Sequence, residues 1–166
     1  GANVLRITAK QQLMREIVDI LSVLTSEAKL VWGHKGLSIS VVDGSHVALL
    51  SATIADECFE TYEVEPVEIG LDLQKMRDLL TLAGPSDLVE MDYDDAVGAI
   101  NVRVGEVLMI LRGIDTTTMD NPNQPNLEFK SKATIGSEKL SRALRAAKFV
   151  GGEVDLSMDK NQLSVS

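Results

Sequence analysis

The sequence has few of the residues that give small domains cross-links or aromatic packing. Its 166 residues include one cysteine, Cys58, and only 4% are aromatic. A single cysteine excludes an internal disulfide and is typical of a reducing compartment. Because 45% of the residues are hydrophobic and so few are aromatic, we expect a sizeable core built from aliphatic side chains.

Long apolar runs and targeting signals are also missing from the sequence. No run approaches the roughly 18 residues that a membrane span needs. The first residues contain no basic segment followed by an apolar stretch, so no secretory signal is visible. The sequence therefore predicts a soluble intracellular protein that does not associate with membranes.

Positive charge is absent from one long stretch of the chain. No Lys or Arg occurs between residues 36 and 74, whereas acidic residues are frequent there: Asp43, Asp56, Glu57, Glu60, Glu63, Glu65, Glu68 and Asp72. The net charge of −9, taken alone, argues against binding to nucleic acid. The uneven distribution allows two interpretations, a solvated acidic surface or a molecule with an acidic outside and a less acidic or basic inside.

Patterns typical of catalytic and metal sites are scarce. The only histidines are His34 and His46, and neither a cysteine pair nor a Gly-rich phosphate loop is present. Asp92, Asp94 and Asp95 stand at a predicted hairpin turn, where aspartate is favoured for backbone reasons rather than as a metal ligand. Cys58 has no motif that would pair it with a histidine as a nucleophile. We therefore predict no catalytic residue, no metal site and no cofactor.

An internal repeat organises the chain. Three segments have helical spacing, residues 10–24, 72–82 and 137–150, with Asp72 and Ser137 as candidate N-caps. Each follows a short strand-like run and precedes two more such runs around a turn. Met14, Met76 and Leu140 hold equivalent places, 62 and 64 residues apart. Further strands in the first two copies, "HVALLSATI" and "EVLMILRG", complete a β-α-β-β-β unit.

The repeat predicts two domains, the second of which is incomplete. Residues 113–129, "GIDTTTMDNPNQPNLEF", have almost no hydrophobic periodicity and contain Pro122 and Pro125, as a linker does. We expect a first domain of two copies at residues 1–115, a connecting linker at 116–126, and the N-terminal part of a second domain at 127–166. The third copy stops at Ser166, where its next strand is expected. Antiparallel sheets with the helices on one face form an α+β fold.

The predicted helices and the rest of the chain differ in net charge. Residues 10–24 and 72–82 each sum to zero, whereas residues 137–150 sum to +3. The remainder of the chain therefore has a net charge of −12. This segregation favours a helical surface that is less acidic than the exterior.

Four segments carry a resemblance to a known family: "VVDGSHVALL", "FETYEVE", "GLDLQKMRDLLTLAG" and "LRGID". In these segments the sequence resembles the sliding clamps of the proliferating cell nuclear antigen family, of the archaeal kind. The resemblance covers essentially the whole chain and implies the DNA-clamp fold. It also implies a non-catalytic processivity factor for replication and repair, whose ring encircles duplex DNA and tethers other proteins.

The resemblance assigns the helices to the DNA-facing surface of the ring. A clamp that slides must meet phosphates through mobile Lys and Arg side chains without reading bases. The expected DNA-binding residues are Lys10, Arg15, Lys75, Arg77, Lys139, Arg142, Arg145 and Lys148. Glu16 and Asp78 stand where the family often has basic residues, so we expect a weakly positive inner surface.

The resemblance also implies two protein-binding surfaces. A hydrophobic pocket for partner peptides would use Val42, His46, Val47, Leu49 and Met119, although the linker "DNPNQ" is more polar than is usual in the family. The alternative for His46 is an ordinary turn histidine beside a buried strand. The apolar edge strand would form the subunit interface through Val107, Leu108, Met109, Ile110, Leu111 and Arg112.

The resemblance also implies the partners. They are duplex DNA, DNA polymerase, the clamp loader, other proteins with clamp-binding peptides, and further copies in a trimeric ring. The expected location is the cytoplasm at the nucleoid, or the nucleus in a eukaryote. The alternative is an interaction module with the clamp fold, such as a hetero-oligomeric or checkpoint-type subunit that does not close a ring by itself.

Overall fold

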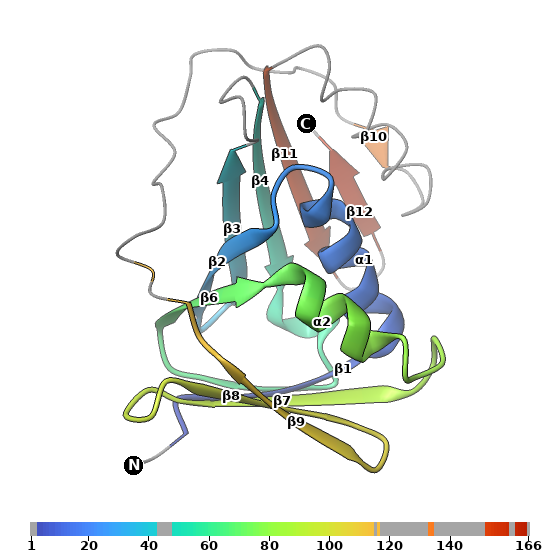
Figure 1. Cartoon of the computed structure of the whole chain (residues 1–166). Helices are drawn as coiled ribbons and strands as arrows, with labels where there is room; N and C mark the ends of the chain where they lie inside the picture. Colours follow the sequence, from blue (N-terminus) through green and yellow to red (C-terminus); the bar gives the residue numbers. More distant parts are fainter. Residues whose placement is uncertain are drawn as a thin grey trace.

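The computed structural model describes residues 3–42, 48–114, 116, 133–134, 152–159 and 162–165, and for residues 42, 48–50 and 133 onward it describes the backbone only. Two sheets, two α-helices and one short 3-10 helix make up the regular structure of the described part of the chain (Figure 1). None of these helices is long and apolar enough to cross a membrane. The α+β class predicted from the repeat is confirmed.

The predicted β-α-β-β-β unit occurs twice. The first copy consists of β1 (Leu5–Lys10), α1 (Gln11–Ser22), β2 (Glu27–Gly33), β3 (Gly36–Val42) and β4 (Ala48–Ala55). The second consists of β6 (Val67–Asp72), α2 (Leu73–Leu80), β7 (Leu88–Asp94), β8 (Ala99–Val104) and β9 (Val107–Arg112). β6 and α2 each begin 62 residues after β1 and α1, which confirms the period read from the sequence.

Further elements join and follow these two copies. The short helix η1 (Asp56–Cys58) and β5 (Thr61–Val64) connect them, and the sequence analysis did not predict β5. β10 (Ala133–Thr134), β11 (Gly152–Asp159) and β12 (Gln162–Val165) belong to the third copy. The predicted helix at residues 137–150 lies outside the described residues.

The first two copies exchange their first strands. β1 pairs with β7 of the second copy, and β6 pairs with β2 of the first. The five-stranded sheet has the order β5-β1-β7-β8-β9, and the seven-stranded sheet has the order β10-β12-β11-β4-β3-β2-β6. Because each sheet contains strands of both copies, neither copy folds around a core of its own.

One strand pair departs from the expected antiparallel arrangement. β11 pairs with β4 in parallel, with Gly152 opposite Ala48 and Met158 opposite Ile54. The other described pairs of named strands are antiparallel. In the repeat, β11 corresponds to β2 and β7, which pair with first strands, so its parallel pairing with a fourth strand breaks the pattern of the first two copies.

A single aliphatic core fills the space between both sheets and both helices. On α2 the predicted stripe of Leu73, Met76, Leu79 and Leu80 is buried. On α1 the buried face includes Met14 and Val18, whereas Leu13 is only partly buried. Three of the six aromatic residues form a cluster, in which the rings of Trp32, Phe59 and Tyr62 lie with centroids 5.3 to 6.2 Å apart.

The two helices begin in different ways. The side chain of Asp72 accepts a hydrogen bond from the amide of Lys75 at 3.1 Å, so the predicted N-cap of α2 is confirmed. α1 has no side-chain cap at Lys10. Its first amides, of Gln11 and Gln12, instead donate to the carbonyls of Asp87 and Pro85 at 2.8 and 3.1 Å. The loop after α2 therefore satisfies the N-terminus of α1, which ties the first copy to the second.

Candidate nucleic-acid and subunit interfaces

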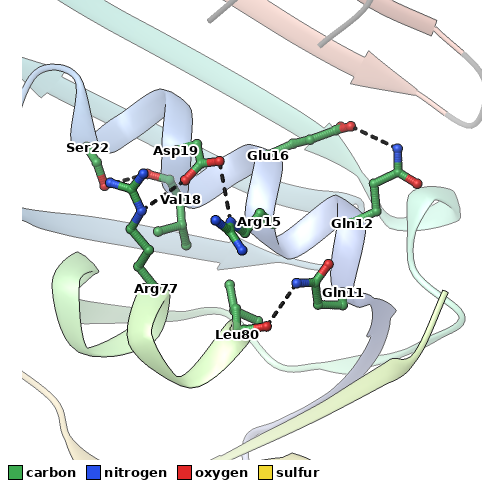
Figure 2. A network of polar contacts seen from close by, with 9 residues as sticks. All are labelled: Gln11, Gln12, Arg15, Glu16, Val18, Asp19, Ser22, Arg77 and Leu80. Atoms are coloured by element: carbon green, nitrogen blue, oxygen red, sulfur yellow. Dashed lines mark hydrogen bonds and ion pairs between the residues drawn. The ribbon is translucent and has the colours of Figure 1, made fainter. Parts of the chain in front are cut away.

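The exposed sides of α1 and α2 form one helical surface, defined here by Lys10, Gln12, Arg15, Glu16, Asp19, Gln74, Lys75, Arg77 and Asp78. The two helices lie side by side, on the same side of the seven-stranded sheet in Figure 1. Gln11, the one buried polar residue among the described side chains, donates from Nε2 to the carbonyl of Leu80 at 2.9 Å (Figure 2). This buried hydrogen bond joins the start of α1 to the end of α2, and it was not predicted.

An ion-pair network crosses the two helices on this surface. Nε of Arg15 lies 3.6 Å from Oδ2 of Asp19, and Nε of Arg77 lies 3.4 Å from Oδ1 (Figure 2). The two arginine side chains are 37% and 38% exposed, and that of Asp19 is 29% exposed. The structure thus joins two of the predicted DNA-binding residues through a carboxylate that sequence reasoning did not single out. In the sequence, the i, i+4 spacing of Arg15 and Asp19 on α1 is a signal for the pair between these two residues, and nothing comparable indicates the contact with Arg77.

The remaining predicted DNA-binding residues divide between described and undescribed parts of the chain. Lys10 and Lys75 are exposed on the helical surface. Four more were predicted on the third helix, and they lie outside the described residues: Lys139, Arg142, Arg145 and Lys148. Within the described helical surface the charges of the four basic residues are balanced by those of Glu16, Asp19 and Asp78, with Asp72 at the N-cap of α2. The surface is therefore close to neutral.

The edge strand β9 carries the predicted subunit-interface residues. Among the described strands it pairs only with β8, so its other edge has no partner there. Val107, Leu108, Met109 and Ile110 are 41%, 50%, 44% and 65% exposed, whereas Leu111 is buried. Arg112 is exposed. Four adjacent exposed apolar residues on an unpaired edge are unusual in a protein that remains a monomer.

Most of the predicted partner-peptide pocket cannot be located in the structure. His46, Val47 and Met119 lie outside the described residues. Val42 ends β3 and Leu49 lies in β4, and the backbones of these two residues pair with one another. The two strands thus place the backbones of two predicted pocket residues directly opposite one another, and the pocket itself stays a prediction.

The acidic hairpin between β7 and β8 forms the predicted turn. Oδ1 of Asp94 accepts from the amide of Ala96 at 3.0 Å, and its carbonyl accepts from the amide of Gly98 at 2.9 Å. Oδ1 of Asp92 accepts from Nδ2 of Asn101 at 2.8 Å. These carboxylates are engaged in turn and cross-strand hydrogen bonds. Among the described residues, no group of three or more acidic, histidine or cysteine side chains is arranged to hold a metal ion.

One titratable group of the described part has a clearly shifted pKa. Burial and the nearby charge of Asp56 raise the pKa of Tyr62 to about 12, from an ordinary value of 10.0. Its hydroxyl donates to the carbonyl of Gly33. Tyr62 packs in the aromatic cluster away from the helical surface, so the shift reflects packing between β5 and β2 rather than a reactive site.

The chain is similar to known proteins both by family model and by sequence. The family model described as "Proliferating cell nuclear antigen, N-terminal domain" matches residues 6–107. The DNA polymerase sliding clamp of Methanocorpusculum labreanum is 29% identical over 155 residues, which cover 93% of this chain and 63% of the relative. The DNA polymerase sliding clamp of Methanosarcina mazei is 31% identical over 137 residues, which cover 82% of this chain and 56% of the relative. The chain spans less than two thirds of the length of these relatives.

Solved structures agree with this assignment. The structure of A. fulgidus proliferating cell nuclear antigen with the C-terminal region of FEN-1 bound has a TM-score of 0.73 and 26% identity, over 87% of this chain and 60% of that one. The protein from Entamoeba histolytica shares the fold, with a TM-score of 0.73 at 16% identity over 99% of this chain and 69% of that one. With the N-terminal-domain model matched over most of the described residues, the chain belongs to the proliferating cell nuclear antigen family.

Proposed function

We propose that this chain is part of a DNA sliding clamp, a ring that encircles duplex DNA and tethers replication and repair proteins. The observation that carries the proposal is the pair of helices α1 and α2 held together on one side of the molecule, in a chain whose relatives are named DNA polymerase sliding clamps. The helical surface faces the DNA, and the opposite faces of the sheets lie outside. The role is binding rather than catalysis.

Charge supports this orientation. The stretch without Lys or Arg lies between residues 36 and 74, and its described acidic residues lie mostly on η1, β5 and β6, away from the helical surface. Six of them are exposed: Asp56, Glu57, Glu60, Glu63, Glu65 and Glu68. An acidic exterior repels DNA from every surface except the helical one. A nearly neutral helical surface in the first two copies, together with the +3 charge of residues 137–150, gives weak attraction to phosphates that permits sliding.

Ring closure and partner binding follow from the other two predicted sites. β9 supplies the edge to which a neighbouring subunit adds a strand, in a ring of three copies. The region around Val42, His46, Val47, Leu49 and Met119 receives the clamp-binding peptides of DNA polymerase, the clamp loader and repair proteins. A protein with these tasks works at the nucleoid in the cytoplasm, or in the nucleus of a eukaryote.

Duplex binding by two matched charge-reversal variants tests the orientation. Lys75→Glu with Arg77→Glu changes the helical surface, and Arg6→Glu with Arg103→Glu changes the outer face of the five-stranded sheet, where both arginines are exposed. Both double variants lower the net charge equally. Because each phosphate contact contributes about 0.9 to the slope of log K against log salt, we expect the helical variant to flatten the slope by about 1 to 2.

Fluorescence anisotropy of a labelled 30-base-pair duplex, titrated between about 20 and 200 mM salt, measures both slopes. The sheet variant should keep the wild-type slope. Equal losses from both variants would show that DNA has no preferred face on this chain. A clamp-fold module that does not encircle DNA would show no salt-dependent binding by the wild-type protein at all.

A further inference from the structure

We propose that Asp19 restrains the attraction of the helical surface for DNA by holding Arg15 and Arg77. This inference rests on the proposed function, because it concerns how strongly the DNA-facing surface binds phosphate. Asp19 is the acidic residue that contacts two basic side chains on the described part of this surface, one on its own helix and one on α2. The ligand of the helical surface in this proposal is the phosphate backbone of duplex DNA.

The contacts of Asp19 place its carboxylate between the two guanidinium groups. Both pairs involve Nε, at 3.6 Å for Arg15 and 3.4 Å for Arg77, and each arginine retains its terminal N–H donors (Figure 2). The arginines come from neighbouring helices, so a single phosphate or two adjacent ones can reach both. Asp19 therefore sits where it competes with phosphate for the same cations and repels the phosphate as well.

The same carboxylate is poorly suited to a purely structural role. Oδ1 of Asp19 is buried, and no donor among the described residues makes a hydrogen bond to it, although Nε of Arg77 is 3.4 Å away. A buried carboxylate oxygen without a hydrogen bond costs free energy of folding. Partly exposed pairs of this kind add little to folding stability. The main effect of Asp19 is consequently on the charge and the freedom of the two arginines.

This arrangement suits a protein that must stay on DNA without being fixed at one position. Two unpaired arginines on adjacent helices would make a strong and localised phosphate site. Pairing both with Asp19 lowers the net charge of the group from +2 to +1 and makes each phosphate contact compete with an internal one. Asp19 thus tunes the first two copies toward weak, exchangeable contacts.

The test compares Asp19→Asn with Glu16→Gln, which removes the same charge from the same side of the same helix. The side chain of Glu16 accepts a hydrogen bond from Nε2 of Gln12 at 3.5 Å, so this control releases no arginine of the network. The 166-residue chain is titrated with a labelled 30-base-pair duplex at several salt concentrations. We expect Asp19→Asn to steepen the salt slope by about 1 to 2 relative to Glu16→Gln, as one or two phosphate contacts are gained.

Expressed as affinity, the expected difference is an additional loss of about 4- to 16-fold between 50 and 200 mM salt for Asp19→Asn. The same two substitutions are then made in an Arg15→Gln, Arg77→Gln background, where the advantage of Asp19→Asn should disappear. Far-UV circular dichroism and thermal unfolding check that the helices persist, and Asp19→Ala provides a second variant if the asparagine perturbs them.

The outcomes separate this inference from the proposed function. Equal slopes for Asp19→Asn and Glu16→Gln, with clear salt-dependent binding by the wild type, overturn the role of Asp19 and leave the clamp intact. An advantage of Asp19→Asn that survives without the two arginines also overturns it. Absence of salt-dependent binding in the wild type and every variant overturns both.

Discussion

Replacing Gly70 with alanine is expected to destabilise the protein by separating β6 from the chain that follows β9. Gly70 lies in β6, and the amide of Ile114 donates to its carbonyl at 2.9 Å. A Cβ atom at position 70 would stand 2.5 Å from the carbonyl oxygen of Ile114 and 2.9 Å from its Cβ. Backbone atoms cannot move aside as a flexible side chain does, so the contact must open.

The cost follows from the crowding and the lost hydrogen bond. Overpacking of a closely packed site costs about 1–3 kcal/mol, and an opened backbone hydrogen bond adds about 1 kcal/mol. For a chain of this length, a loss of about 2 kcal/mol lowers the melting temperature by about 4–8 °C. Urea unfolding followed by circular dichroism measures the change, and hydrogen exchange of the Ile114 amide reports on the contact itself.

Gly33→Ala is the matched control, because it adds the same methyl group to a strand of the same sheet. Its Cβ would meet only the carbonyl oxygen of Gly36 at 3.7 Å, an ordinary contact. Where the backbone conformation is compatible, Gly→Ala stabilises a protein by about 0.4–1 kcal/mol through the unfolded chain. A Gly70→Ala protein as stable as Gly33→Ala, with an unchanged exchange rate at Ile114, would refute the reasoning.

Three further predictions concern separate regions of the molecule. Tyr62→Phe should remove a pH dependence of the folding stability. With a folded pKa of about 12 against 10.0, Tyr62 stabilises the wild-type fold below pH 10, and this contribution is lost as pH rises toward 12. The urea midpoints of wild type and variant should therefore differ at pH 8 and converge above pH 11. Ile110→Asp should weaken self-association without loss of stability, because this side chain is 65% exposed; light scattering that finds one chain for wild type and variant at every concentration would contradict the role of β9. Leu49→Asp should abolish binding of a clamp-binding peptide in calorimetric titration while the protein stays folded, and unchanged affinity would end the pocket assignment.

Local patterns in the sequence predicted the elements but not their exchange between copies. The apolar spacing of Leu73, Met76, Leu79 and Leu80 predicted a helix and its buried face, and Asp72 predicted its start, because these features depend on residues within one or two turns. The pairing of β1 with β7 depends on contacts 78 to 88 residues apart, and that of β6 with β2 on contacts 35 to 45 residues apart. Periodicity contains no information on such partners, so the interlocked sheets were not predicted.

The site was predictable to a similar extent. The sequence identified the cations of the helical surface and counted their charges, yet it could not show that Asp19 contacts Arg77, because α2 lies beside α1 only in the folded protein. Gln11 is a second example. A glutamine at the start of an amphipathic helix is ordinarily exposed, and here the neighbouring carbonyl of Leu80 gives its buried amide a partner. Both contacts arise at the seam between the two copies, where the repeat itself gives no signal.

The composition of β9 supports the prediction that a strand of another chain pairs with it. Along β9, Val107 and Met109 lie opposite buried Val104 and Val102, whereas Leu108 and Ile110 lie opposite Arg103 and Asn101 on the other face. An edge strand that faces water on one side normally alternates apolar with polar residues. β9 is apolar on both faces, although among the described elements nothing covers its outer edge. By contrast β4, the fourth strand of the first copy, has its outer edge occupied by β11. Among the described elements, the equivalent strand β9 has no such neighbour, which supports the prediction that a strand of another subunit pairs with its outer edge.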